Sequence, residues 1–112
     1  MLYHLLTESD YKEYQSTETY EPASLKDEGF IHLAYEEQLQ TIVDCFFVGV
    51  TQAYLLDIDK SAIAKDLRDE PPVGAEGDGA LYPHLYSPLS KQAVTRTIKL
   101  VADSSGALKV NL

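Results

Sequence analysis

Hydrophobic positions along the 112 residues fall into short runs with two different periods, which indicates an α+β chain. The helical period is clearest over residues 39–50, where apolar residues recur every three or four positions. This apolar stripe consists of Leu39, Ile42, Val43, Phe46, Phe47 and Val50. Because such a stripe has to be covered, the helix is expected to lie on a sheet or on another helix.

Four other runs have the length and the pattern of strands. Residues 2–6 and 30–34 are short and apolar, whereas residues 53–58 and 93–101 alternate between two faces. In residues 53–58 the only charged side chain within the alternating pattern is that of Asp57. We therefore expect Asp57 to lie on a solvated face.

Two further segments are weaker strand candidates. Residues 81–89 are apolar and aromatic, but Pro83 and Pro88 prevent them from forming a central strand over their whole length. Residues 108–112 follow a predicted turn at residues 104–106 and are expected to form a hairpin partner.

Polar and proline start signals predict three shorter helices. Thr7 opens a capping box, Pro22 suits a first helical position, and Asp59 is a good N-cap residue. These helices are expected over residues 7–14, 22–28 and 59–67. Loops are expected at residues 16–20 and at the proline- and glycine-rich residues 71–79.

The length and the charge limit what the chain can do. Residues 1–112 have the size of a single domain, and no internal repeat interrupts them. The formal net charge is −9, which has the wrong sign for binding nucleic acid or an anionic membrane surface, so neither is expected as a partner. One cysteine, no membrane-length apolar run and no export signal indicate a cytoplasmic protein.

The histidines are the most informative polar residues. His4, His32 and His84 are each followed by leucine inside an apolar run. Burying an imidazole costs free energy unless its ring nitrogens find partners, and three such cases point to a shared polar pocket. We therefore expect a cleft in which the three histidines bind a small polar ligand, with Tyr86 and Arg68 nearby.

Two alternatives remain open. A non-catalytic interaction module would present residues 81–89 to a partner, with each histidine buried and bonded to backbone. A zinc hydrolase would hold its metal through His4, His32 and His84, but their spacing matches no compact metal motif, so no metal is expected. Asp57 and Asp59 could form an acid/base pair at a strand end, but the stronger interpretation is a solvated residue and a helix cap.

Four segments give the chain a family resemblance. They are Tyr20–Leu25, Glu28–Leu33, Leu55–Asp59 and Pro83–Leu89, and the sequence EGFIHL followed by PHLYSPL is specific. Over most of its length the chain resembles the small bacterial domain of unknown function 952 family. That family has no established reaction. Its fold is similar to the ADP-ribosyltransferase fold, a split, curved α+β sheet with flanking helices that holds NAD in a cleft in other families.

The transferase resemblance implies roles for single residues. His4 is similar to a first-strand histidine that contacts a ribose, and His32 stands at the place of a tyrosine that stacks on nicotinamide. The catalytic glutamate of the transferases falls in residues 81–86, which offer His84 and no acid. The resemblance therefore implies NAD, ADP-ribose or another nucleotide-like ligand. If the chain is an enzyme, His32 and His84 are its acid/base groups, but ADP-ribosyl transfer by the usual mechanism is not expected.

Overall fold

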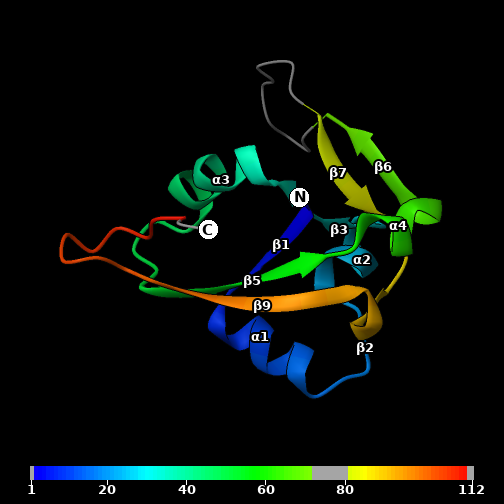
Figure 1. Cartoon of the computed structure of the whole chain (residues 1–112), viewed down its shortest axis with the longest axis horizontal. Coiled ribbons are helices and arrows are strands. Elements are labelled where there is room, and N and C mark those ends of the chain that lie inside the picture. Colours follow the sequence, from blue (N-terminus) through cyan, green and yellow to red (C-terminus); the bar gives the residue numbers. More distant parts are fainter. Residues whose placement is uncertain (1, 72–80, 111–112) are drawn as a thin grey trace.

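The computed structural model describes residues 2–71 and 81–110, and a four-stranded antiparallel sheet lies at its centre (Figure 1). The strand order is β4-β1-β5-β9. The strands are β1 (Leu2–Leu6), β4 (Ala34–Tyr35), β5 (Gln52–Ile58) and β9 (Val94–Val101). The two alternating segments of the sequence thus form the two longest strands, as predicted, and they pair with each other along their length.

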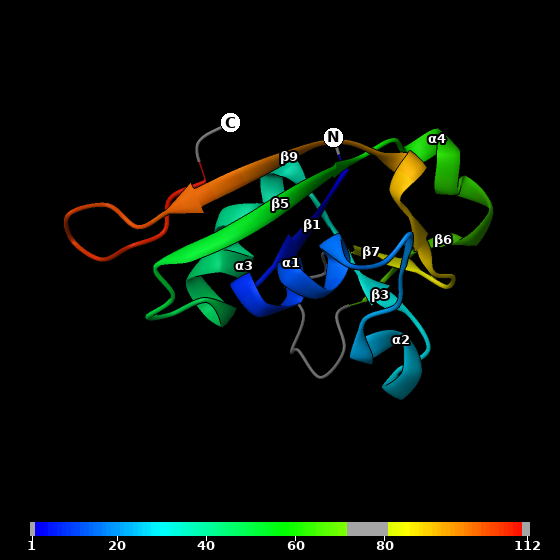
Figure 2. The ribbon, with the colours of Figure 1, turned by 90° about the horizontal axis from the view of Figure 1, so that it is seen from below.

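Helices cover both faces of this sheet (Figures 1 and 2). The first, α1 (Glu8–Gln15), lies on one face, and α3 (Leu39–Phe46), which follows the 3-10 turn η1 (Glu36–Gln38), lies on the other. Because side chains alternate along a strand, β1 directs Leu2 and Leu6 into the core beside α1 and Tyr3 into the core beside α3. The mixed α+β class predicted from the sequence is confirmed.

Asp57 is buried, so its predicted place on a solvated face is wrong. Only 5% of the residue is exposed, and its Oδ2 accepts a hydrogen bond of 2.9 Å from Nε of Arg96 on β9. Alternation assigns a side chain to a face, but it does not show whether a helix covers that face. Asp59 caps α4 (Lys60–Ile63) by accepting a hydrogen bond from the Ser61 amide, as predicted.

A second antiparallel sheet has the order β3-β7-β6. Its strands are β3 (Ile31–His32), β6 (Leu67–Glu70), which follows the 3-10 turn η2 (Ala64–Asp66), and β7 (Tyr82–Leu85). Although β7 contains Pro83, it is the central strand. The carbonyl of Pro83 accepts from the Leu33 amide just beyond the end of β3. Proline has no amide N–H to donate. On the side of β7 where Pro83 would need one, the hydrogen-bond ladder with β3 has already ended.

The smallest sheet lies partly in a segment predicted to be a loop. It pairs β2 (Thr19–Tyr20) with β8 (Leu89–Ser90), and both Tyr20 and Leu89 are buried. Two residues are too few to show a period, which is why the pattern gives no strand here. The neighbouring elements are α2 (Ala23–Asp27), inside the predicted range, and the 3-10 turn η3 (Lys91–Ala93), which leads into β9.

The helix α3 is shorter than its apolar stripe. It ends at Phe46, and Gly49, with φ +79°, turns the chain toward β5. Leu39 and Val43, on the inner side of the helix, are buried, but Phe46 is 77% exposed. The helical period therefore identifies the core side of the first two turns and fails for Phe46 at the last residue.

After β9, residues 102–110 turn back, and within this described part they form no strand. A tight turn at Asp103–Gly106 is present, but only the single bridge between Ala102 and Leu108 follows it. Residues 111–112 of the predicted partner, and residues 72–80, which hold most of the glycine-rich segment, lie outside the described residues. Among the residues that the structure describes, no helix is long and apolar enough to cross a membrane.

Candidate functional site

The three-stranded sheet places two of the three histidines side by side. His32 of β3 lies directly opposite His84 of β7, and His84 lies directly opposite Arg68 of β6. Directly opposed residues direct their side chains to the same face of a sheet. The other face carries Ile31 and Leu85, which pack into the core beside α1. One face is therefore apolar and structural, and the other carries the polar groups.

His84 is the buried centre of the polar face. It is only 2% exposed, and its ring is stacked on that of Phe30, with 4.1 Å between the ring centroids. Its Nδ1 lies 2.9 Å from Oε1 of Glu70, which comes from the neighbouring strand β6. The Tyr86 hydroxyl donates to the same carboxylate oxygen. The carboxylate thus satisfies one nitrogen of a buried imidazole, as the cost of its burial requires.

The hydrogen bonds of Glu70 also determine its charge. The bond from Tyr86, and then the bond from His84, lower the pKa of the Glu70 carboxyl below its ordinary value. The same carboxylate raises the pKa of the Tyr86 hydroxyl, because the hydrogen bond that the hydroxyl donates to it and its negative charge both oppose ionisation of the hydroxyl. At neutral pH the Glu70 side chain is therefore ionised, and it accepts hydrogen bonds from two donors.

His32 has its own carboxylate partner but is open to solvent. Its side chain is 46% exposed, and Nε2 lies 2.5 Å from Oε2 of Glu28. Gly29, with φ +90°, ends α2 and turns the chain so that residues 28 and 32 face each other. The rings of His32 and His84 are 5.5 Å apart between centroids and nearly perpendicular.

His4 does not share this arrangement. It is 8% exposed, and its Nδ1 lies 2.7 Å from the backbone carbonyl of His32, so this nitrogen donates to the main chain of β3. Burial lowers the pKa of His4 from 6.5 to about 4, which keeps the imidazole neutral at physiological pH. His4 thus has the surroundings that the interaction-module hypothesis expected of every histidine, whereas His32 and His84 are paired with carboxylates.

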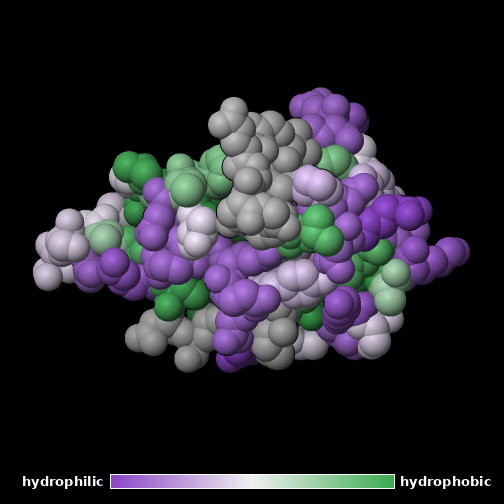
Figure 3. Space-filling model, turned by 90° about the horizontal axis from the view of Figure 1, so that it is seen from above, coloured by the Kyte–Doolittle hydropathy of each residue, from purple (hydrophilic) through white to green (hydrophobic). Residues whose placement is uncertain are grey.

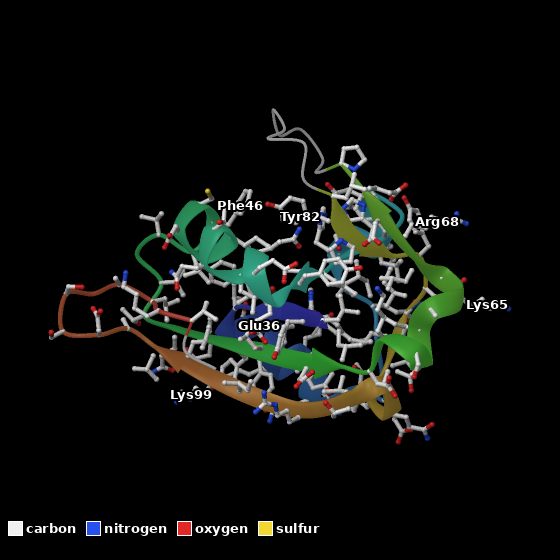
Figure 4. The ribbon with its side chains drawn as sticks, turned by 45° about the horizontal axis from the view of Figure 1, so that its top comes forward. Glu36, Phe46, Lys65, Arg68, Tyr82 and Lys99 are labelled. Carbon is white, nitrogen blue, oxygen red and sulfur yellow. The ribbon has the colours of Figure 1, made fainter. Side chains whose placement is uncertain are left out.

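Arg68 and Tyr86 lie at the outer side of the polar face. The guanidinium of Arg68 is 5.6 Å from the centre of the Tyr86 ring, which is a cation–π distance. Figure 4 shows Arg68 projecting from β6 at the rim of the molecule. Within residues 2–71 and 81–110 Arg68 forms no ion pair with an acidic side chain. Its positive charge is therefore available to a ligand.

Three residues of the site were not predicted from the sequence: Glu28, Phe30 and Glu70. Glu70 belongs to a charged run that reads as ordinary surface, and nothing in the sequence shows that β6 will pair with β7. Glu28 lies four residues before His32, a spacing that could have suggested a pair only if the intervening turn were known. Phe30 could have been found by alternation, since it lies two residues from His32 on the same face.

Two hollows lie away from the imidazoles, and none of the three histidines lines either of them. The larger, of about 430 Å³, lies between α1 and α2, and the smaller, of about 240 Å³, lies between the end of α3 and the turn after β9. The larger is lined by Glu13, Thr17, Thr19, Tyr20, Glu21, Pro22, Leu25 and Lys26. The three imidazoles therefore do not share either of these two hollows.

The described residues also offer no arrangement for the three-histidine metal site. No three His, Cys, Asp or Glu side chains among them are placed to hold one ion. The reason is geometric, since Nδ1 of His4 is directed to a backbone oxygen while Nδ1 of His84 and Nε2 of His32 are directed to carboxylates.

Comparison with known proteins gives a family and a shared fold. The model of a family described as "Protein of unknown function (DUF952)" matches residues 5–97. The chain is similar to the crystal structure of protein CC0527 from Caulobacter crescentus, with 31% sequence identity and a TM-score of 0.81 over 96% of this chain and 92% of that one. The solution NMR structure of CC0527 gives 32% identity and a TM-score of 0.78 over 95% and 89% of the two chains. No curated protein matches the chain.

Proposed function

The chain belongs to the DUF952 family, and we propose that the polar face of its sheet β3-β7-β6 binds a small, nucleotide-like molecule. The observation that carries the proposal is the pair of imidazoles from β3 and β7. Each is held at one ring nitrogen by a carboxylate, and the second nitrogen of each has no hydrogen-bond partner among the described residues. A histidine with a purely structural role would need a partner for its own ring. It would not need a second histidine beside it that also has a carboxylate partner.

The charge on this face fits a ligand with an anionic part. The chain as a whole carries a net charge of −9, which repels anions at a distance. At the site itself, Arg68 offers a guanidinium whose planar donors match a phosphate or a carboxylate. The ring of Tyr86 lies under that guanidinium and is 38% exposed, so it offers an edge for a planar ring. We therefore propose a ligand with a planar ring, hydroxyl groups and a phosphate.

NAD and ADP-ribose are the first ligands to test, because the resemblance to ADP-ribosyltransferases implies them. We retain a transferase-like fold as part of this proposal. Residues 81–86 contain no acid, and the carboxylate that lies next to His84 is that of Glu70 on β6. That carboxylate already accepts from His84 and Tyr86, so we assign it no transferase role. If the site is catalytic, His84 and His32 are the groups suited to move a proton.

The interaction-module alternative receives less support. Pro83, His84, Leu85 and Leu89 are all buried, so residues 81–89 present only separated side chains such as Leu81 and Tyr86. Figure 3 shows that the described residues on the face that it presents are mainly hydrophilic, with hydrophobic residues in small separate groups. A protein-binding surface usually has a continuous apolar centre, and the described residues visible on this face do not form one.

The proposal is tested by an NMR titration of the imidazole signals with NAD, ADP-ribose and nucleoside phosphates. We expect saturable shifts at His32 and His84 and none at His4, which serves as the internal reference because it is bonded to backbone. Unchanged signals of His32 and His84 across the whole panel would reject the proposal.

A matched pair of variants tests the role of the cation in the same titration. Arg68→Ala should weaken binding of a phosphate-bearing ligand by about tenfold, as expected for the loss of one charged hydrogen-bond donor. Lys65→Ala removes an exposed cation from η2, outside the sheet, and should leave the affinity unchanged (Figure 4). Equal losses of ligand affinity in the two variants would show that Arg68 acts only through its charge and not as a specific hydrogen-bond donor to the ligand.

A further inference from the structure

Glu70 receives two hydrogen bonds on one carboxylate oxygen, from groups on β7 and just beyond it. We infer that Glu70 is a positioning residue that fixes His84 as its Nδ1–H tautomer, so that Nε2 presents a lone pair to a ligand group that donates a hydrogen bond. The tautomer part of this inference stands on the geometry of the ligand-free site. The part that concerns the ligand rests on the proposed function.

The direction of the hydrogen bond follows from the chemistry of the acceptor. An ionised carboxylate can only accept, so each of its partners has to donate. The Nδ1 of His84 lies 2.9 Å from Oε1 and therefore carries the proton in this contact. In a neutral imidazole the other nitrogen then has a free lone pair. Within the described residues, Nε2 of His84 has no hydrogen-bond partner.

The surroundings of His84 hold the ring in the orientation that directs Nδ1 at Glu70. The residue is only 2% exposed and is stacked on Phe30, while the ring of His32 closes in at a nearly perpendicular angle. Glu70 is itself held by its place on β6, where it pairs with Tyr82, and by the hydroxyl of Tyr86. A ring turned by 180° would direct Cδ2 instead of Nδ1 at the carboxylate and would lose this hydrogen bond.

His32 differs from His84 in the nitrogen that it leaves free. Its Nε2 faces Glu28, so Nδ1 is the nitrogen available to a ligand. It is also half exposed, which lets its ring reorient. The polar face therefore holds one fixed acceptor, on His84, beside one adjustable group, on His32. A fixed acceptor selects a hydroxyl or an N–H group, such as those of a sugar or a base, and disfavours an ionised phosphate oxygen at that point.

The test of the tautomer is a long-range ¹H–¹⁵N spectrum of the imidazoles in the ligand-free protein at pH 7.5. We expect the pattern of a protonated Nδ1 and an unprotonated Nε2 for His84. Glu70→Ala should abolish this single pattern and give a mixture of tautomers. Glu28→Ala, the matched control, should change only the pattern of His32. An Nε2–H pattern in the unmodified protein, or an unchanged pattern in Glu70→Ala, would overturn the assignment.

A second variant keeps the test decisive if Glu70→Ala does not fold. Glu70→Gln has nearly the same shape, but its amide can serve Nδ1 as donor or as acceptor, so an Nε2–H signal should appear for His84. Persistence of the single Nδ1–H pattern in a folded Glu70→Gln protein would contradict the role of the carboxylate.

The ligand part is tested separately with adenosine and inorganic phosphate as probes. Adenosine, which offers hydroxyl and amino donors, should shift Nε2 of His84, and phosphate at the same concentration should not. A shift caused by phosphate but not by adenosine would overturn the donor requirement. If neither probe nor any nucleotide shifts the imidazoles, the proposed function fails, while the tautomer assignment is still decided by the ligand-free spectra.

Discussion

His4 and His84 are both buried, but the protein stabilises the two imidazoles in different ways. His84 is bonded to a carboxylate, whereas His4 is bonded to a backbone carbonyl and has no acid within hydrogen-bond distance among the described residues. Burial in such surroundings disfavours the charged form, which lowers the pKa of His4 to about 4. The same residue type thus supplies a structural link in β1 and a candidate ligand group in β7.

The depressed pKa of His4 predicts an acid-dependent loss of stability. The unfolded chain binds a proton at this residue near pH 6.5 and the folded chain only near pH 4, so stability falls as the pH drops through that interval. The difference between the two pKa values corresponds to about 3 kcal/mol. His4→Asn keeps a donor for the His32 carbonyl but does not titrate. The unfolding free energy of this variant is measured by urea denaturation at several pH values. As the pH drops through the same interval, it should fall by about 3 kcal/mol less than that of the wild type. Parallel pH curves for the two proteins would contradict the assignment.

At the scale of elements, the predictable parts of the fold are those with a period. Residues 2–6, 52–58 and 94–101 show strand patterns long enough to read, and Thr7 and Asp59 cap helices as their side-chain chemistry predicts. The two-residue strands have no readable period. The central place of β7 could not be predicted either, because it depends on where β3 ends next to a proline.

The candidate site was only half predictable for the same reason. Histidines in apolar runs are visible in the sequence, and they identified His32 and His84. The partner Glu70 is separated from them by a strand pairing that no local signal specifies. The partner of His4 is a backbone oxygen, which no side-chain pattern can reveal.

The stripe of α3 offers a direct comparison of pattern with packing. Leu39 and Phe46 are equivalent in the helical period, but Leu39 is fully buried and Phe46 is 77% exposed. Leu39→Ala should lower the unfolding free energy by about 2–5 kcal/mol through the cavity that it leaves. Phe46→Ala should change it by no more than about 0.5 kcal/mol. Urea denaturation of both variants measures the difference, and similar losses for the two would show that Phe46 is buried in solution.

At the scale of the whole molecule, one short segment connects the two larger sheets. Residues 31–35 contribute β3 to the three-stranded sheet and β4 to the four-stranded sheet, and His4 of β1 bonds to the carbonyl of His32 between them. The polar face therefore rests on the main core through β3. This support gives the site the fixed backbone that precise ligand contacts require.

The whole molecule also offers other places where a small ligand could bind. The groove between α1 and α2 has a volume of about 430 Å³ and includes two glutamates and one lysine, and the hollow beside α3 is smaller and less polar. Neither holds an imidazole pair or an arginine. We therefore propose that the ligand binds at β3, β6 and β7, although the larger of these two hollows lies elsewhere.

Mapping every backbone amide during a titration with ADP-ribose tests this placement most directly. We expect the shifted ¹H–¹⁵N signals to cluster on β3, β6 and β7, around His32, Arg68 and His84, with the segment 13–26 unchanged. Shifts that cluster instead on residues 13–26, at the groove between α1 and α2, would contradict the account.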